Sequence, residues 1–303
     1  MNEIKKLIEK YDLKVRGIKE QQKIKIIDTD KGKFVLKRCS SKEKGLYEYL
    51  QNKNFHYLLE KEELDGYNVY PYIQEIKEEK EEKAMDLIYI LSILHNKTLF
   101  YRKIVMDQVK EVYEEYTSRL DYLNYYYHDL QDMIEQKVYM SPAEYLLIRN
   151  ISLIYSALNY SKSNLKMWYE EKRNQKKERV VLLHNKPSLD HILIGEDKKL
   201  ISWDHYTKGC PIFDFLYFYR KNYLEVEMTS LFQMYQSRFC YTSDEYLLFF
   251  SLISIPEKIE FTSNHYQNTT RVYELVKYVE KTKDFVLKED EKNQKEDKDK
   301  FQK

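Results

Sequence analysis

The chain has 303 residues, enough for one large domain or for two lobes, and its 33% charged and 43% hydrophobic residues are typical of a water-soluble globular protein. The 51 basic and 50 acidic residues leave a net charge of +1, which argues against binding nucleic acid through a broad basic surface. The odd number of cysteines, three, and their wide spacing indicate neither a disulfide framework nor a zinc site. No apolar run is long enough to span a bilayer, and the amino-terminal segment lacks the apolar stretch of a secretory signal, so we expect a protein made and kept inside a cell.

The first 75 residues carry the pattern of a small antiparallel sheet with one helix. Alternating apolar residues predict a strand over 23–27. A turn with Gly32 near its end follows, and residues 34–38 are then the second strand of a hairpin. A helix is predicted from about residue 42 to 53, and a further strand over 67–73.

The rest of the chain is mainly helical. A charged run at 75–83 indicates a solvated helix face, and from 84 to about 173 Leu, Ile and Tyr recur at three- and four-residue spacing. Within this stretch, Ser141 and Glu144 have the spacing of a capping box, which predicts the start of a helix. The charged segment 281–303 offers few apolar residues to bury, so we expect a frayed helix or a disordered tail.

One polar loop, HNKPSLDHIL from 184 to 193, lies between two short apolar strands. It begins with His184, has Lys186 two residues later, and has His191 five residues after that. Loops held between rigid strands often carry catalytic side chains.

A second motif, Ile-Ser-Trp-Asp at 201–204, follows this loop. It continues with Gly209, Pro211 and Asp214. A third pattern lies near the amino terminus, where the strand 34–38 carries Lys37. An acid in the next helix would be its partner, with Glu43 the first candidate and Glu48 the second.

Together with the order of a small β lobe before a helical lobe, these motifs resemble the aminoglycoside-phosphotransferase branch of the protein-kinase-like fold, over roughly residues 15 to 260. The resemblance implies an α+β, two-lobe fold. Its N-lobe would be residues 1–75, a small antiparallel sheet with one helix. Its C-lobe would be the mostly helical residues 76–280 with a catalytic-loop-like β insertion, followed by the charged tail 281–303. It also implies a cleft between the lobes where a lysine such as Lys37 contacts the phosphates of Mg-ATP.

The resemblance also implies which positions would carry the chemistry, and three of these are replaced. The family has a proton-accepting Asp where this chain has Lys186, a metal-binding Asn where it has His191, and a metal-binding Asp where it has Ser202. A protonated lysine cannot act as the base, serine brings no charge to a dication, and histidine is a poor magnesium ligand. The nucleotide-binding hairpin also lacks glycine at 19–23. We therefore expect no catalysis, no metal and no cofactor.

The remaining motif residues would keep the frame. The resemblance implies structural support from Trp203, Gly209, Pro211 and Asp214. It implies a vestigial nucleotide or phosphate cleft lined by Lys37, Glu43, His184, Asp190 and Asp204.

Two other functions stay open. Asp204 lies two residues after the replaced metal-binding position, and Asp190 lies next to His191, so either could serve an atypical small-molecule phosphotransferase that uses Mg-ATP. Alternatively, Lys37, Lys186 and His191 could converge to bind a small anion in the inter-lobe cleft.

Three further stretches narrow the resemblance. They are the His-x-Lys-Pro-Ser-x-x-His loop, a Pro-Ile-x-Asp stretch leading into an aromatic helix that ends at Tyr219-Arg220, and the Ile-Pro-Glu-Lys at 255–258. They resemble the CotS-like, and in particular the YutH-like, spore coat proteins of endospore-forming bacteria. The resemblance implies a pseudokinase with a structural or assembly role in sporulation, synthesised in the cytoplasm of the mother cell and located in the spore coat with other coat proteins as partners.

Overall fold

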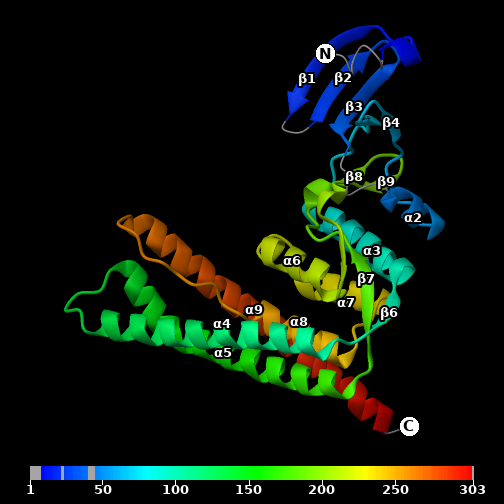
Figure 1. The fold of residues 1–303 in the computed structure, drawn as a ribbon. Helices are drawn as coiled ribbons and strands as arrows, with labels where there is room; N and C mark the ends of the chain where they lie inside the picture. The colour runs from blue at the N-terminus through cyan, green and yellow to red at the C-terminus, as the bar shows by residue number, and fades with distance from the viewer. Residues whose placement is uncertain (1–7, 22–23, 40–44, 302–303) are drawn as a thin grey trace. The chain divides into compact units, whose positions relative to one another are not determined.

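The computed structural model describes residues 8–21, 24–39 and 45–301, with their side chains as far as residue 292. By their contacts, the residues form two compact units, one of Met1–Thr98 with His184–Thr207 and one of Leu99–Leu183 with Lys208–Lys303 (Figure 1). The lobe boundary at residue 75 that the sequence suggested differs from this grouping and stays a prediction.

The first unit is built on a five-stranded antiparallel sheet with strand order β1-β2-β3-β5-β4. Its strands are β1 (Val15–Gln21), β2 (Ile24–Thr29), β3 (Gly32–Arg38), β4 (Glu62–Leu64) and β5 (Tyr67–Pro71). The strands predicted at 23–27, 34–38 and 67–73 are confirmed as β2, β3 and β5, and β1 and β4 are additional. Ile27, Leu36 and Val69 from the middle strands meet Leu13 in a buried cluster, because alternate residues of a strand point to the same face.

Two helices and a second hairpin complete this unit. They are α2 (Leu46–Asn52), α3 (Lys80–Thr98), and the strands β8 (Ile192–Ile194) and β9 (Lys198–Leu200). The short 3₁₀ turns η2 (Leu189–His191) and η3 (Trp203–His205) flank this hairpin, and α3 packs against η2 and β9. Gly45 precedes α2 and is in the left-handed region at φ 80°. The helix predicted over residues 42–53 is confirmed for 46–52.

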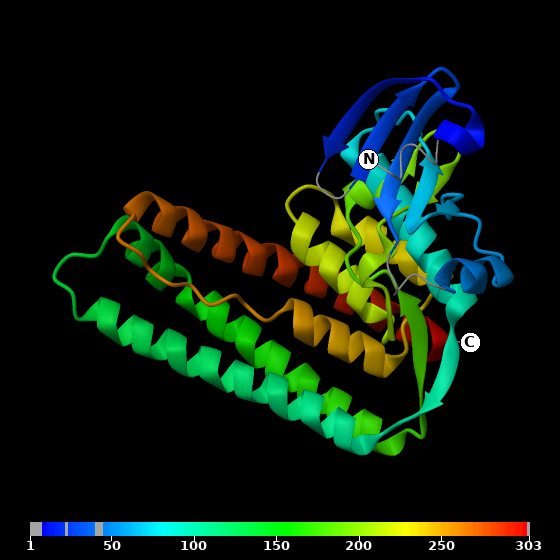
Figure 2. The ribbon, with the colours of Figure 1, turned by 45° about the horizontal axis from the view of Figure 1, so that its top comes forward.

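The second unit is mainly helical. Its helices are α4 (Met106–Glu135), α5 (Pro142–Asn174), α6 (Ile212–Asn222), α7 (Met228–Arg238), α8 (Ser243–Ile253) and α9 (His265–Phe301). The long helices α4 and α5 run side by side, and α5 also packs against α8 and α9 (Figure 2). The capping box at the start of α5 is confirmed, because the Ser141 hydroxyl accepts from the Glu144 amide and the Glu144 carboxylate accepts from the Ser141 amide. A small sheet, in the order β10-β7-β6, is formed by β6 (Phe100–Lys103), β7 (Lys177–Leu183) and β10 (Thr207–Gly209).

An aromatic core holds the helices of the second unit together. Phe232 of α7 stacks on Phe249 of α8 with ring centroids 5.2 Å apart, and Phe285 of α9 contacts Phe232 edge-on. The expectation of a frayed or disordered tail from residue 281 is therefore wrong for 281–292, where Phe285 and Val286 are buried on a continuous helix. Within the described residues, no helix has both the length and the apolarity needed to cross a membrane.

Candidate functional site in the first unit

Lys37 is held on the face of β3 that the sheet core does not use. Its neighbour Leu36 is buried in the core cluster, and alternation along the strand directs Lys37 the opposite way. The Lys37 ammonium forms an ion pair with Asp204, Nζ to Oδ2 at 2.7 Å, and the two side chains are 18% and 34% exposed. Of the partners suggested by sequence, Glu43 lies outside the described residues and Glu48 is exposed on α2. The sequence placed Asp204 in the same cleft as Lys37 but did not identify it as the ion-pair partner of this lysine.

His184 is the anchor of the polar loop. It directly follows β7, is completely buried, and its Nε2 donates to the backbone carbonyl of Ile201 at 2.8 Å. Its ring packs against Trp203, with centroids 5.1 Å apart, and against His191 at 5.4 Å. This single side chain therefore ties the loop after β7 to the segment that carries the second motif.

Trp203 also packs where the loop after β7 meets the segment of the second motif. It is buried, its indole Nε1 donates to the carbonyl of Leu200 at 3.0 Å, and its ring meets Phe55 edge-on at 6.1 Å. The indole satisfies its one donor inside the protein, so the ring acts as packing and not as a group offered to a ligand.

The positions expected to carry chemistry hold side chains that serve the loop or face solvent. The Lys186 side chain is exposed, while its backbone carbonyl accepts a hydrogen bond from Nδ1 of His191 at 2.9 Å. His191 thus uses one ring nitrogen to close the loop on itself. Asp190 is exposed, and its amide donates to the Ser188 hydroxyl that caps η2. Ser202 is in the left-handed region, at φ 65° and ψ 52°.

These residues do not fit the magnesium ion that a phosphotransferase uses. Magnesium requires several oxygen ligands, usually carboxylates with water and phosphate. Ser202 offers a neutral hydroxyl, His191 offers nitrogen, and the Asp204 carboxylate is occupied by the Lys37 ammonium. Among the residues that the structure describes, no group of three His, Cys, Asp or Glu side chains is arranged to hold a metal.

The other motif residues lie in the second unit. Gly209, in β10, approaches β7 so closely that a Cβ there would lie 2.9 Å from Cδ1 of Leu183, and a side chain would force Leu183 to move. Pro211 precedes α6, and Asp214 is completely buried in the first turn of that helix. The expected supporting roles of these residues stay predictions, and the close approach of β10 to β7 gives a packing reason for glycine at position 209.

The sequence matches no family model and no curated protein sequence. Solved structures are similar: an aminoglycoside phosphotransferase from Alicyclobacillus acidocaldarius aligns over 93% of this chain and 93% of its own, with a TM-score of 0.67 and 12% identity. Choline kinase LicA from Streptococcus pneumoniae aligns over 91% of this chain and 99% of its own, with a TM-score of 0.46 and 13% identity. This chain has the aminoglycoside-phosphotransferase-like, kinase-like fold. At this identity the similarity is one of fold, and the activity has to be argued from the site.

Within this kinase-like fold, the site residues foreseen from sequence fall into two groups. The structure brings Lys37, His184, Trp203 and Asp204 into one unit with the loop 184–193. It leaves Asp190 and the side chain of Lys186 in solvent. The Lys37–Asp204 ion pair had one usable signal in the sequence, since Asp204 lies just beyond a position where the resembled family has a metal-binding acid.

Proposed function

We propose that this protein is a pseudokinase, a kinase-like protein that does not transfer phosphate and acts as a structural or assembly component. The observation that supports this most is the ion pair of Lys37 with Asp204, 2.7 Å long, beside a loop whose base and metal positions are Lys186, His191 and Ser202. The lysine that would stabilise phosphate charge is neutralised by a carboxylate of the same chain.

The chemistry of phosphoryl transfer explains why this combination is inactive. The reaction depends almost wholly on positioning and on neutralising charge at the phosphates, with magnesium supplying much of that charge. An ammonium at Lys186 cannot take the proton of an acceptor hydroxyl at pH 7. ATP would also have to displace Asp204 from Lys37 without a magnesium ion to compensate the released carboxylate.

The association with the spore coat is the finer part of this proposal. It is supported by the resemblance of the loop and of the stretches at 211–220 and 255–258 to CotS-like proteins. A fluorescent fusion produced in a sporulating bacterium should collect around the developing spore. Uniform fluorescence of the mother cell throughout sporulation would count against the coat location and leave the pseudokinase proposal untouched.

Thermal melting with nucleotide tests the absence of ATP binding. A ligand at 100 times its Kd adds about 2.7 kcal/mol to the free energy of unfolding. We expect no magnesium-dependent rise in Tm with millimolar ATP. The matched control is the triple variant Lys186→Asp, His191→Asn and Ser202→Asp, which restores the family's residue types and should gain such a rise. A magnesium-dependent rise in the unaltered protein would refute the proposal.

A second function, an atypical small-molecule phosphotransferase, is favoured by one observation. Asp204 lies beside Lys37, as a replacement metal ligand near the phosphates would have to. This function requires ATP turnover that Asp204→Asn abolishes and that Asp197→Asn, at an exposed acid in the β8–β9 turn, leaves unchanged. The anion-binding function gains nothing from the structure, since Asp204 offsets the charge of Lys37.

A further inference from the structure

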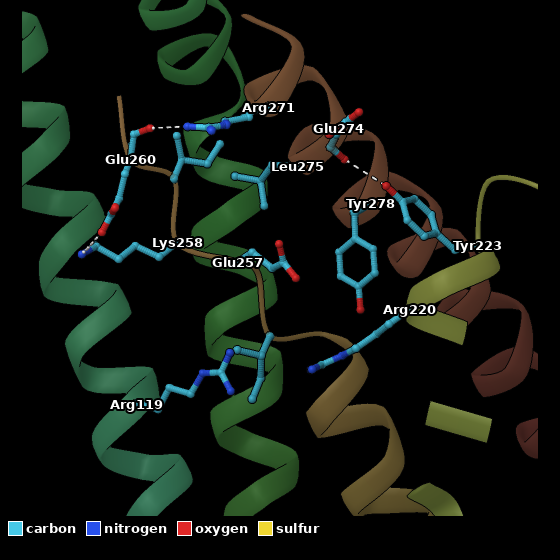
Figure 3. A pocket seen from close by; sticks show the side chains of 12 residues that line it. Arg119, Arg220, Tyr223, Glu257, Lys258, Glu260, Arg271, Glu274, Leu275 and Tyr278 are labelled. Carbon is cyan, nitrogen blue, oxygen red and sulfur yellow. Dashed lines mark hydrogen bonds and ion pairs between the residues drawn. The ribbon is translucent and has the colours of Figure 1, made fainter. Parts of the chain in front are cut away.

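A pocket of about 520 Å³ lies within the second unit, whereas Lys37, Asp204 and the loop 184–193 belong to the first unit. It is formed by α4, α6, α9 and the segment that follows α8 (Figure 3). Its apolar lining consists of Ile255, Ile259 and Leu275, all buried, while charged side chains surround them. The volume is within the range of small-molecule sites, roughly 300–1,000 Å³.

Two arginines enter this pocket from different helices. Arg119 comes from α4 and Arg220 from the last turn of α6, and their guanidinium groups extend toward one another (Figure 3). Neither makes an ion pair with a carboxylate anywhere in the described part of the chain. Burial raises the pKa of Tyr116, and the positive charges of Arg220 and Arg119 both oppose that shift.

Arg220 is fixed in place by the end of α8. Its Nη2 donates to the carbonyl of Leu252 at 2.7 Å, and the Tyr278 hydroxyl donates to the next carbonyl, that of Ile253, at 2.6 Å. Carbonyls in the last turn of a helix have no partner within the helix, so they hold external donors well. A guanidinium has five N–H donors in a rigid fork, and the Leu252 carbonyl engages one of them while the Tyr278 hydroxyl lies beside the group.

The acidic residues that line the pocket differ in whether they form ion pairs. Lys258 pairs with Glu260 at 2.8 Å and lies over the ring of Tyr126, so its charge is already compensated. Glu257 lies in the middle of the lining with its carboxylate in the pocket (Figure 3), and it forms no ion pair with the described residues. The pocket therefore presents the convergent cations Arg119 and Arg220 and the separate anion Glu257. Arg271, which donates to the Glu260 carbonyl at 3.3 Å, and Glu274 also line it.

We propose that this pocket binds a small zwitterion, with a phosphate or carboxylate group clamped by Arg119 and Arg220 and a protonated amine meeting Glu257. The planar guanidinium matches both oxyanions through paired N–H donors, and Arg220 is already oriented for it. A purely anionic ligand would leave Glu257 beside its own negative charge, and a purely cationic ligand would face two arginines.

Titration calorimetry with defined probes tests this site. The probes are 2-aminoethyl phosphate and β-alanine as zwitterions, ethyl phosphate as the anionic half, and ethanolamine as the cationic half. We expect saturable binding of at least one zwitterion, at least tenfold weaker binding of ethyl phosphate, and none of ethanolamine. A preference between the two zwitterions identifies the anionic group. The absence of saturable binding with both zwitterions would overturn the proposal.

Variants assign any binding to the pocket. Arg119→Gln should weaken zwitterion binding at least tenfold without changing the Tm of the free protein, because Arg119 has no ion pair to lose. Arg149→Gln, at an exposed arginine of α5 in the same unit, should bind like the unaltered protein. Glu257→Gln should remove the advantage of the zwitterion over ethyl phosphate. Equal weakening by Arg149→Gln, or unchanged binding in Arg119→Gln, would overturn the assignment. Lys37→Ala should bind normally, which separates this site from the kinase-like one.

Discussion

Replacing His184 by alanine tests whether the loop 184–193 is kept in shape by its one completely buried histidine. The change removes the hydrogen bond to the Ile201 carbonyl, 2.8 Å long, and the ring packed against Trp203. An unsatisfied buried carbonyl costs about 1–3 kcal/mol, and truncating a large buried side chain costs about 2–5 kcal/mol in all. Ile201 is only half-buried, so water can partly replace the lost donor. We expect the free energy of unfolding to fall by about 2–4 kcal/mol.

Urea denaturation followed by tryptophan fluorescence measures this loss. The chain has two tryptophans, so a Trp168→Phe background leaves Trp203, which contacts His184 directly, as the reporter. Lys186→Ala in the same loop is the matched control and should change the free energy of unfolding by less than about 0.5 kcal/mol, because the Lys186 side chain is exposed. If the two variants unfold at the same urea concentration, the buried His184 does not hold the loop in shape.

Four further predictions concern the second unit, each measured by urea or thermal unfolding. Lys172→Met leaves the Asp244 side chain, 6% exposed, without its ammonium partner at 2.7 Å, and should lower the free energy of unfolding by about 3–5 kcal/mol. Replacing both residues by apolar ones should restore most of that stability. Burial alone would raise the pKa of Asp244, but the hydrogen bond and charge of Lys172 lower it below its ordinary value. Stability should therefore fall as the pH drops below about 4, and less so in Asp244→Asn. Gly209→Ala should cost about 1–3 kcal/mol through its clash with Leu183, partly recovered by Leu183→Val. Phe285→Ala should cost about 3–5 kcal/mol, and a loss under 1 kcal/mol would mean that this part of α9 is not packed.

The sheet was largely predictable because its inner strands show the period of two that burial on one face imposes. In β2, Ile24 and Ile26 flank Lys25; in β3, residues 34–36 form a short apolar run; and a glycine turn joins the two strands. β1 was missed for the opposite reason. It is an edge strand whose residues are mostly exposed, so no alternation marks it, and edge strands are commonly polar.

The tail was misjudged because its average composition hid a short apolar stripe. Thr282, Phe285, Val286 and Glu289 are buried and recur at three- and four-residue intervals, as on one face of a helix. Lysines and acids between them dominate the composition, so the segment looks unable to fold unless its periodicity is followed past residue 281.

The site was predictable as a set of motifs but not as a set of contacts. The spacing from His184 to His191 and the second motif identify the loop and its frame. The pairing of Lys37 with Asp204 joins residues 167 positions apart, and it depends on how β3 and η3 approach each other in the folded unit. No local spacing encodes that distance, which is why a helix acid was the natural sequence-based candidate.

Ser202 shows that the shape of the loop and its chemistry are separable. A left-handed conformation costs a residue other than glycine roughly 1–2 kcal/mol, and Ser202 adopts it at φ 65°. The flanking contacts hold it there. The Ile201 carbonyl accepts from His184, the Ile201 amide donates to the His191 carbonyl at 2.8 Å, and Trp203 is buried directly afterwards. All of these contacts use the backbone of the turn or its neighbours, and none needs the side chain at 202. The conformation of the turn around residue 202 is therefore held by packing that does not involve the side chain at that position, so the turn keeps its shape with a serine there.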